Sequence, residues 1–101
     1  RQCAVDVDSL LRNYDRASSK FVSPAEASLA AASTEWFTAG VWCVKEAVYK
    51  YAGRRGLDFL RDIEVLSVDE GSGDFLVSVA GIGQLPVSTF VFGGYMVASI
   101  A

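Results

Sequence analysis

Residues 34–52 read TEWFTAGVWCVKEAVYKYA, the longest segment of the chain with the pattern of a helix. Its apolar side chains recur at steps of four and three residues, the spacing that places them on one side of an α-helix. They are Phe37, Val41, Val44, Val48 and Tyr51. We therefore predict a long helix that begins at Ser33 or Thr34, presents this side to a core, and ends at Gly53, a residue suited to the position just after a helix.

The sequence on either side of this helix predicts strands. Apolar and polar residues alternate, with the period of a strand, at residues 3–8, 63–67 and 75–79, and residues 95–100 form a last apolar segment. Glycine-rich turns separate the later segments, which indicates an antiparallel meander. We expect an α+β fold in which an antiparallel sheet packs against the long helix.

Two shorter helices are predicted between the first strand and the long helix. Residues 9–16 have the spacing of a helix with one packed side. Ser23, Pro24 and Glu26 form a helix start, with a capping serine, a proline in the first turn and a glutamate that completes a capping box, and the alanine-rich run to Ala32 continues it. We expect residues 1–101 to form one domain, either independent or part of a longer chain, since the first residue is not Met.

Composition excludes several classes of protein. The 101 residues are 51% apolar and 21% charged, which is too apolar for a disordered chain. A net charge of -3 gives no basic field for nucleic acid, and no apolar run reaches the ~20 residues that a membrane helix needs. With two cysteines, Cys3 and Cys43, and no histidine, we expect neither a disulfide scaffold nor the usual zinc site, and we place the chain in the cytoplasm.

Two carboxylates near the end of the first strand are candidate metal ligands. Asp6 and Asp8 are two residues apart, so they share one face of the strand. Carboxylates that repel one another are stabilised by a hard divalent cation such as Mg²⁺ between them. The alternative is a solvated strand face, or an Asp8 that only caps the helix predicted after it.

A second candidate lies in the long helix. Trp42, Glu46 and Lys50 are one turn apart on one side, with Lys45 at its edge. The alternative is an exposed Glu–Lys pair worth about 0.3–0.5 kcal/mol, but the large apolar Trp42 favours a partly enclosed site. With the two aspartates, these residues predict a site for Mg²⁺ and phosphate. The basic turn over 53–56 either contacts further phosphates or is only a solvated turn.

These residues resemble the 4′-phosphopantetheinyl transferases. The chain has AVDVD at residues 4–8 where that family has G-[IV]-D-x-[ED], and WCVKEAVYK at 42–50 where it has [FW]-x-x-K-E-A-x-x-K. FVSPAE at 21–26 is similar to the family's linking segment, F-[FL]-S-P-x-E, and Arg12 stands at the family's arginine. The glycine turn over 53–56 is one residue longer than the family's.

The resemblance implies transfer of 4′-phosphopantetheine from coenzyme A to a serine of an apo acyl or peptidyl carrier protein, with release of adenosine 3′,5′-bisphosphate. It implies that Asp6, Asp8 and Glu46 ligate Mg²⁺, and that Glu46 orients or deprotonates the serine. Lys50 would act near the bridging oxygens of the pyrophosphate. The basic residues expected to contact coenzyme A are Lys45, Lys50, Arg12, Arg54 and Arg55, of which Arg12 could instead face the carrier protein.

The same resemblance implies a partner. FVFGGY at residues 90–95 stands where small single-domain members have a Ser-His-acid segment, and is closer to the second half of two-domain members. We therefore expect a homo-oligomer, a dimer or trimer, or pairing with another half-domain. The interface candidates are Leu85, Val91, Phe92 and Tyr95, with the sheet core as the alternative place for them.

A rival function stays open: a catalytically weak domain that binds coenzyme A or a carrier protein, or only scaffolds a synthase assembly. A different Mg²⁺-dependent phosphoryl enzyme is disfavoured because the sequence has no G-x-x-x-x-G-K-[ST] loop.

Overall fold

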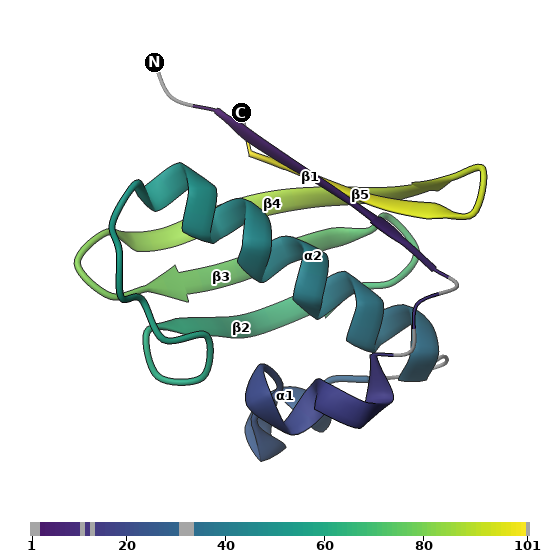
Figure 1. Ribbon diagram of the computed structural model, residues 1–101, viewed down its shortest axis with the longest axis horizontal. Helices are drawn as coiled ribbons and strands as arrows, with labels where there is room; N and C mark the ends of the chain where they lie inside the picture. Colours follow the sequence, from purple (N-terminus) through teal and green to yellow (C-terminus); the bar gives the residue numbers. More distant parts are fainter. Residues whose placement is uncertain (1–2, 11, 13, 31–33, 101) are drawn as a thin grey trace.

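One five-stranded antiparallel sheet carries a long helix across one of its faces (Figure 1). The computed structural model describes residues 3–10, 12, 14–30 and 34–100. The elements in chain order are β1 (Ala4–Ser9), the 3-10 helix η1 (Asp15–Lys20), α1 (Pro24–Ala27), α2 (Thr34–Ala52), β2 (Ile63–Asp69), β3 (Asp74–Val79), β4 (Gly83–Phe92) and β5 (Tyr95–Ile100). This architecture confirms the predicted α+β fold.

The order of the strands places the beginning of the chain beside its last strand. The sheet runs β1-β5-β4-β3-β2, so β2 to β5 form a meander and β1 pairs with β5 at the edge. Asp6 lies opposite Ala98 and Asp8 lies opposite Met96. The acidic strand is therefore held by the strand farthest from it in the sequence.

Helix α2 follows the sequence prediction closely. Phe37, Val41, Val44 and Val48 are all at most 1% exposed, in the layer between helix and sheet. Burial of each such side chain stabilises the fold by about 1.5–3 kcal/mol. The helix ends at Ala52 and is followed by Gly53, whose φ of 64° lies in the left-handed region that glycine adopts without strain. The predicted helix and its end are confirmed.

Helix α1 has the predicted capping box. The backbone N–H of Glu26 donates to Oγ of Ser23 at 3.1 Å, and the backbone N–H of Ser23 donates to Oε1 of Glu26 at 2.9 Å. The helix ends at Ala27, earlier than predicted, and residues 31–32 of the predicted extension lie outside the described residues.

One expectation about the segment after β1 is wrong. Instead of a helix over residues 9–16, β1 continues to Ser9 and the first helical turns begin at Asp15; residues 11 and 13 lie outside the described part. The reason is that β1 stays paired with β5 as far as Ser9 opposite Tyr95, which keeps the backbone extended. Strand β4 was not among the predicted strands.

The face of the sheet opposite α2 carries exposed apolar side chains. Val7 and Phe90 both lie opposite Val97, one on each side of β5. Exposed large side chains of this region form what we call the outer apolar patch. It consists of Val5, Val7, Phe90, Phe92 and Tyr95.

The four predicted interface candidates divide into two kinds. Leu85 packs, partly buried, against the core, whereas Val91, Phe92 and Tyr95 are exposed. Whether the exposed ones meet a partner stays a prediction. Among the described helices, none is long and apolar enough to cross a membrane.

Candidate functional site

The site lies where β1 faces helix α2. Asp6 and Asp8 point toward the helix, and Asp6 is only 7% exposed. Val5 and Val7 point the other way and are more than half exposed. A strand that is half buried normally turns its apolar side inward, so β1 has the reverse orientation. The alternative of a solvated acidic face is therefore wrong, and the acidic face is the one that the fold encloses.

Lys50 of α2 neutralises one of these carboxylates. Its Nζ donates to Oδ1 of Asp6 at 2.8 Å and to the backbone carbonyl of Val5 at 3.3 Å. Burial raises the pKa of Asp6, but hydrogen bonds from Asp8, Lys50 and Cys43 outweigh that effect and bring it below its ordinary value. Asp6 is therefore an anion held next to an ammonium group.

Asp8 has the opposite character. Burial, followed by its hydrogen bond with Asp6 and the Asp6 charge, raises the pKa of Asp8 to about 6. The guanidinium of Arg12 lies 3.7 Å from Oδ1 of Asp8 and opposes this shift. It also lies over the rings of Tyr14 and Trp42, 5.7 and 5.5 Å from their centres. Arg12 is thus held at the site by two aromatic faces.

Glu46, on α2, is the third carboxylate at the site, after Asp6 and Asp8 of β1. Burial, then the charge of Asp6, raises the pKa of Glu46, while Lys50 and Arg12 lower it. The side chain is half-buried. Glu46 therefore lies within electrostatic reach of the same acidic and basic groups, and its carboxylate accepts a proton more readily than that of an ordinary glutamate.

Two carboxylate oxygens at the site have no donor. Among the described residues, Oδ2 of Asp6 and Oδ2 of Asp8 are buried and have no donor when both carboxylates are ionised. A buried, unpaired carboxylate oxygen is unfavourable, and protonation of Asp8 or a bound cation would relieve it. Anionic oxygens that converge in this way are the ligands that Mg²⁺ prefers. The chemistry of these ligand oxygens fits a divalent cation.

Cys43 is a member of the site that the sequence analysis did not include. Its thiol donates to the backbone carbonyl of Asp6 at 3.3 Å and to that of Met96 at 3.5 Å. One ligand atom each from Asp6, Asp8 and Cys43 lie within 4.8 Å of one another. Cys43 precedes Glu46 by three residues, which places the two on neighbouring positions of the helix. This spacing is the sequence signal from which Cys43 could have been predicted as a site residue. We call Asp6, Asp8, Cys43, Glu46 and Lys50 the β1–α2 site.

Lys45 does not belong to this site, which corrects the prediction that it contacts phosphate. The side chain is fully buried, and its Nζ lies 3.0 and 2.9 Å from the two carboxylate oxygens of Glu26. It also donates to the backbone carbonyl of Phe59. The reason is its position in the helix: Lys45 follows Val41 by four residues and precedes Val48 by three, so it lies on the apolar side.

Glu26 is a structural residue that the sequence analysis treated only as a cap. Besides Lys45 and the backbone of Ser23, its carboxylate accepts the backbone N–H of Val65 at 2.7 Å. One buried carboxylate thus joins α1, α2 and β2. A buried ion pair whose remaining lone pairs are satisfied in this way fixes the arrangement of these elements.

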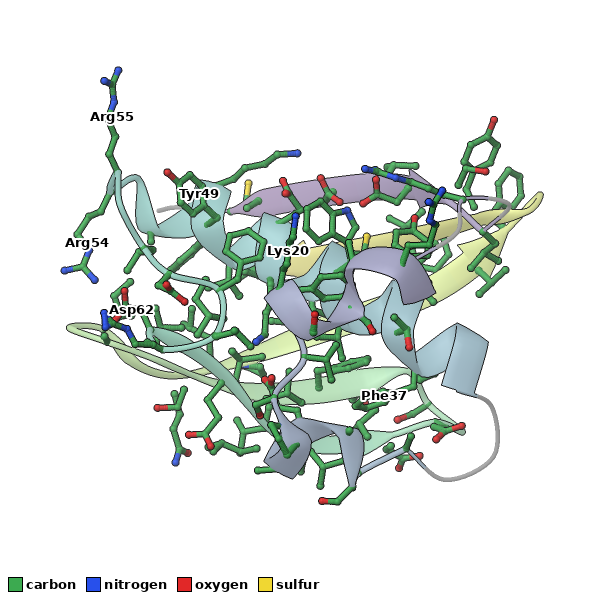
Figure 2. All side chains as sticks on the ribbon, turned by 60° about the horizontal axis from the view of Figure 1, so that its bottom comes forward. Lys20, Phe37, Tyr49, Arg54, Arg55 and Asp62 are labelled. Atoms are coloured by element: carbon green, nitrogen blue, oxygen red, sulfur yellow. The ribbon has the colours of Figure 1, made fainter. Side chains whose placement is uncertain are left out.

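Arg54 and Arg55 follow the end of α2. Figure 2 shows Arg55 pointing away from the body of the protein and Arg54 lying on the side of Asp62. Arg54 donates to the backbone carbonyl of Ala80, and both arginines line a shallow pocket of about 300 Å³. In the described residues no ion pair joins either guanidinium to Asp6 or Asp8, so their contact with phosphates stays a prediction.

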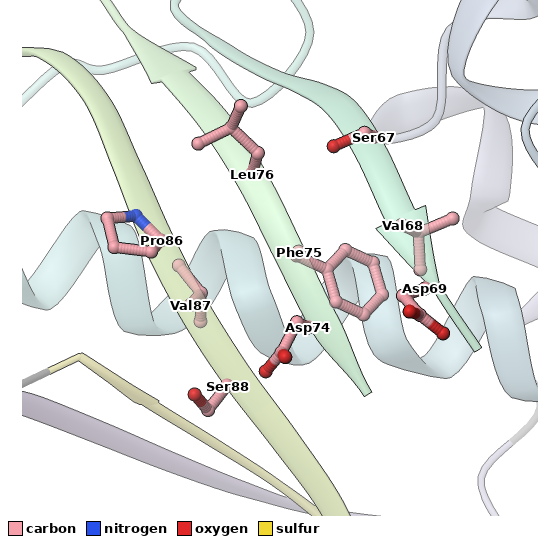
Figure 3. A pocket seen from close by; sticks show the side chains of 9 residues that line it. All are labelled: Ser67, Val68, Asp69, Asp74, Phe75, Leu76, Pro86, Val87 and Ser88. Atoms are coloured by element: carbon pink, nitrogen blue, oxygen red, sulfur yellow. The ribbon is translucent and has the colours of Figure 1, made fainter. Parts of the chain in front are cut away.

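A larger pocket, of about 630 Å³, lies over β2, β3 and β4 (Figure 3). Its charged lining residues are Asp69 and Asp74, and it has no basic one. Asp69 already accepts the backbone N–H groups of Gly71 and Ser72 in the turn. This pocket therefore lacks the charge that a phosphate group requires.

A family model matches most of the chain. The sequence model described as the 4′-phosphopantetheinyl transferase superfamily matches residues 2–89, which include the whole β1–α2 site. A search of curated proteins finds no match.

Proposed function

Because the chain belongs to the 4′-phosphopantetheinyl transferase superfamily, we propose that it transfers 4′-phosphopantetheine from coenzyme A to a serine of an apo acyl or peptidyl carrier protein. The other product is adenosine 3′,5′-bisphosphate. We propose that residues 1–101 act as one transferase domain in the cytoplasm, alone or within a longer chain. The free state of both cysteines is compatible with a reducing compartment.

The observation that carries this proposal is the enclosed acidic face of β1. Asp6 and Asp8 point at α2, with an unpaired buried oxygen on each, and Lys50 reaches the same place. Two anions and a cation on a partly enclosed surface suit a metal-bound pyrophosphate, because phosphoryl transfer depends on positioning and on charge stabilisation.

We propose that Asp6, Asp8 and Glu46 hold Mg²⁺, which when bound would neutralise charge on the pyrophosphate of coenzyme A. Lys50 is the ammonium group nearest to this acidic set, so it would stabilise the charge that develops on the leaving phosphate. Arg12 would contact the nucleotide or the carrier protein from its place over Trp42.

Glu46 is proposed as the base. The oxygen of the carrier serine forms a bond to phosphorus, the bond from phosphorus to the leaving phosphate breaks, and the hydroxyl proton passes to Glu46. The raised pKa of Glu46 suits a group that must be ionised and still accept a proton.

We also propose that the chain self-associates, or pairs with a second half-domain, through the outer apolar patch. Phe92 is 74% exposed and Phe90 is 55% exposed, on the open face of the sheet. Exposed aromatic side chains grouped on one face are typical of an interaction surface.

The test incubates the protein with coenzyme A, Mg²⁺ and an apo carrier protein, and measures the mass of the carrier. We expect the mass to increase by one phosphopantetheine group, and the increase to disappear in Glu46→Gln. Glu64→Gln, at an exposed position of β2, is the matched control and should keep activity. A carrier that gains no mass with wild-type protein, or still gains it with Glu46→Gln, refutes the mechanism; binding of coenzyme A without transfer would favour the scaffold function.

A further inference from the structure

The proposed reaction leaves the Cys43 thiol without a task, although it lies in the β1–α2 site. The residue is 0% exposed, and its sulfur lies within 4.8 Å of a carboxylate oxygen of Asp6 and of Asp8. Its present hydrogen bonds go to two backbone carbonyls, at 3.3 and 3.5 Å. A small apolar residue would fill the same place in the helix, so packing alone does not require sulfur.

The carboxylates beside this thiol have free ligand positions. Oδ1 of Asp6 binds Lys50, but Oδ2 has no partner among the described residues, and the Asp6 side chain is more than nine-tenths buried. Oδ2 of Asp8 is likewise buried and unpaired. A carboxylate oxygen of each aspartate and the sulfur therefore lie within 4.8 Å of one another, and each aspartate has a buried oxygen without a donor when both are ionised.

We propose that Asp6, Asp8 and Cys43 form a mixed oxygen–sulfur site for a thiophilic divalent cation of the zinc and cadmium type. Such an ion would occupy the oxygens that the proposed function assigns to Mg²⁺. The two kinds of ion should therefore compete for the site. This competition rests on the proposed function, but the binding of the thiophilic ion does not.

The chemistry of the ligands sets the selectivity. Mg²⁺ takes oxygen ligands and gains nothing from sulfur, whereas thiolate selects zinc-like ions. As the metal–sulfur bond forms, the thiol loses its proton to the buffer, so binding releases one proton for each ion. The negative charges of Asp6 and Asp8 disfavour a free thiolate at Cys43. They attract the cation, so the thiolate forms only when the metal is bound.

The experiment titrates the protein with Cd²⁺ and follows the ultraviolet charge-transfer band of a cadmium–thiolate bond. The parent protein is Cys3→Ser, which removes the other cysteine, an exposed one, and leaves Cys43 as the only thiol. We expect a band that saturates at one Cd²⁺ per chain, and Mg²⁺ in excess should shift the titration to higher Cd²⁺ concentration.

Three variants of this parent locate the site. Cys43→Ser and Cys43→Ala should abolish the band and weaken Cd²⁺ binding at least about tenfold, since loss of even an outer-shell partner of a metal ligand typically costs 10–100-fold in affinity. Mg²⁺ affinity, measured by calorimetry, should change less than about twofold, because Mg²⁺ takes oxygen ligands and does not use the sulfur. Asp6→Asn should weaken both ions. Circular dichroism and thermal unfolding identify variants that fail to fold, and two different replacements of Cys43 guard against that.

The outcomes separate this inference from the proposed function. Absence of the band in the Cys3→Ser protein, or Cd²⁺ affinity unchanged in Asp6→Asn, overturns the mixed site even if phosphopantetheine transfer occurs. A band that requires Cys43 and Asp6 supports the site even if the transfer assay fails, in which case only the proposed function is lost.

Discussion

The ammonium group of Lys50, near the end of α2, lies 2.8 Å from Oδ1 of Asp6 on the first strand. The lysine is half exposed, whereas the aspartate is buried, so the cation reaches the acid from the solvent side. Lys50 thereby serves as the counter-ion of Asp6 in the protein described here. Under the proposed function, a divalent cation bound to Asp6 would weaken this pairing and make the ammonium group available to a phosphate.

Replacing Lys50 by alanine should therefore separate cation binding from transfer. We expect Mg²⁺ affinity to be retained or increased, because a competing positive charge is removed. Transfer should fall about 10²–10³-fold in kcat, the usual cost of removing one group that stabilises charge in a transition state. Calorimetry and the carrier mass assay measure the two quantities. Arg61→Ala removes an exposed positive charge elsewhere and is the control; weaker Mg²⁺ binding with unchanged transfer would contradict this role.

Cation binding should depend on pH through Asp8. Because burial and its hydrogen bond with Asp6 raise the pKa of Asp8 to about 6, the carboxylate is protonated below that pH and cannot bind a cation. We expect Mg²⁺ affinity to fall about tenfold from about pH 7 to about pH 5, as the ionised fraction of Asp8 falls.

Calorimetric titrations at the two pH values check this expectation. Arg12→Met should move the midpoint to higher pH, since the Arg12 charge lowers the pKa of Asp8. Affinity that stays constant across this range would show that Asp8 is not a ligand.

The buried pair between Lys45 and Glu26 should matter for stability and not for phosphate binding. Lys45→Met leaves the Glu26 charge buried without its cation, which typically costs about 3–5 kcal/mol. The double variant Glu26→Gln with Lys45→Met should recover part of this loss, because the amide is neutral. Urea unfolding measures the free energies. If Lys45→Met unfolds like wild type but loses coenzyme A binding, the original assignment of Lys45 to phosphate is restored.

The outer apolar patch should control self-association. Val7→Lys and Phe90→Lys each place a charge in the row that crosses β1, β5 and β4, and we expect them to convert oligomers to monomers. Folding stability should change by less than about 0.5 kcal/mol, as is usual for exposed positions.

Analytical ultracentrifugation is the measurement for this surface. Leu66→Lys, a less exposed apolar position of β2, is the control and should leave the oligomer intact. A wild-type protein that sediments as a monomer at every concentration would rule out the patch as a contact between copies.

The parts of the fold with strong local signals could be predicted from sequence. The capping box of Ser23 and Glu26 and the end of α2 at Gly53 depend on residues within one turn of each other, and both are found as expected. Strand β4 escaped prediction for a local reason as well. Pro86 lacks an N–H group and is unusual inside a sheet, and it lies in the first part of β4, where the described pairing is with β3 alone because pairing with β5 begins at Ser88.

The site could be predicted only in part, because periodicity shows which residues share a face and not which face is enclosed. Asp6 and Asp8 do share a face, but their burial depends on α2 packing over β1, a long-range contact. The two lysines of the helix motif differ for a similar reason. Lys45 interrupts the apolar side of the helix and Lys50 does not, and only the Glu26 carboxylate inside the fold explains why a charge is tolerated there.

The pairing of β1 with β5 also orders events during synthesis. Asp8 lies opposite Met96, so the ribosome must release nearly the whole described chain before β1 has a strand with which to pair. Contacts so distant in sequence form slowly, because the intervening loop must first be closed. Until then, the two carboxylates sit on an unpaired strand, and the nascent protein has the residues of the site without its shape. A chain that stops between the end of β1 and the start of β5 would carry both aspartates and lack the strand that pairs with them.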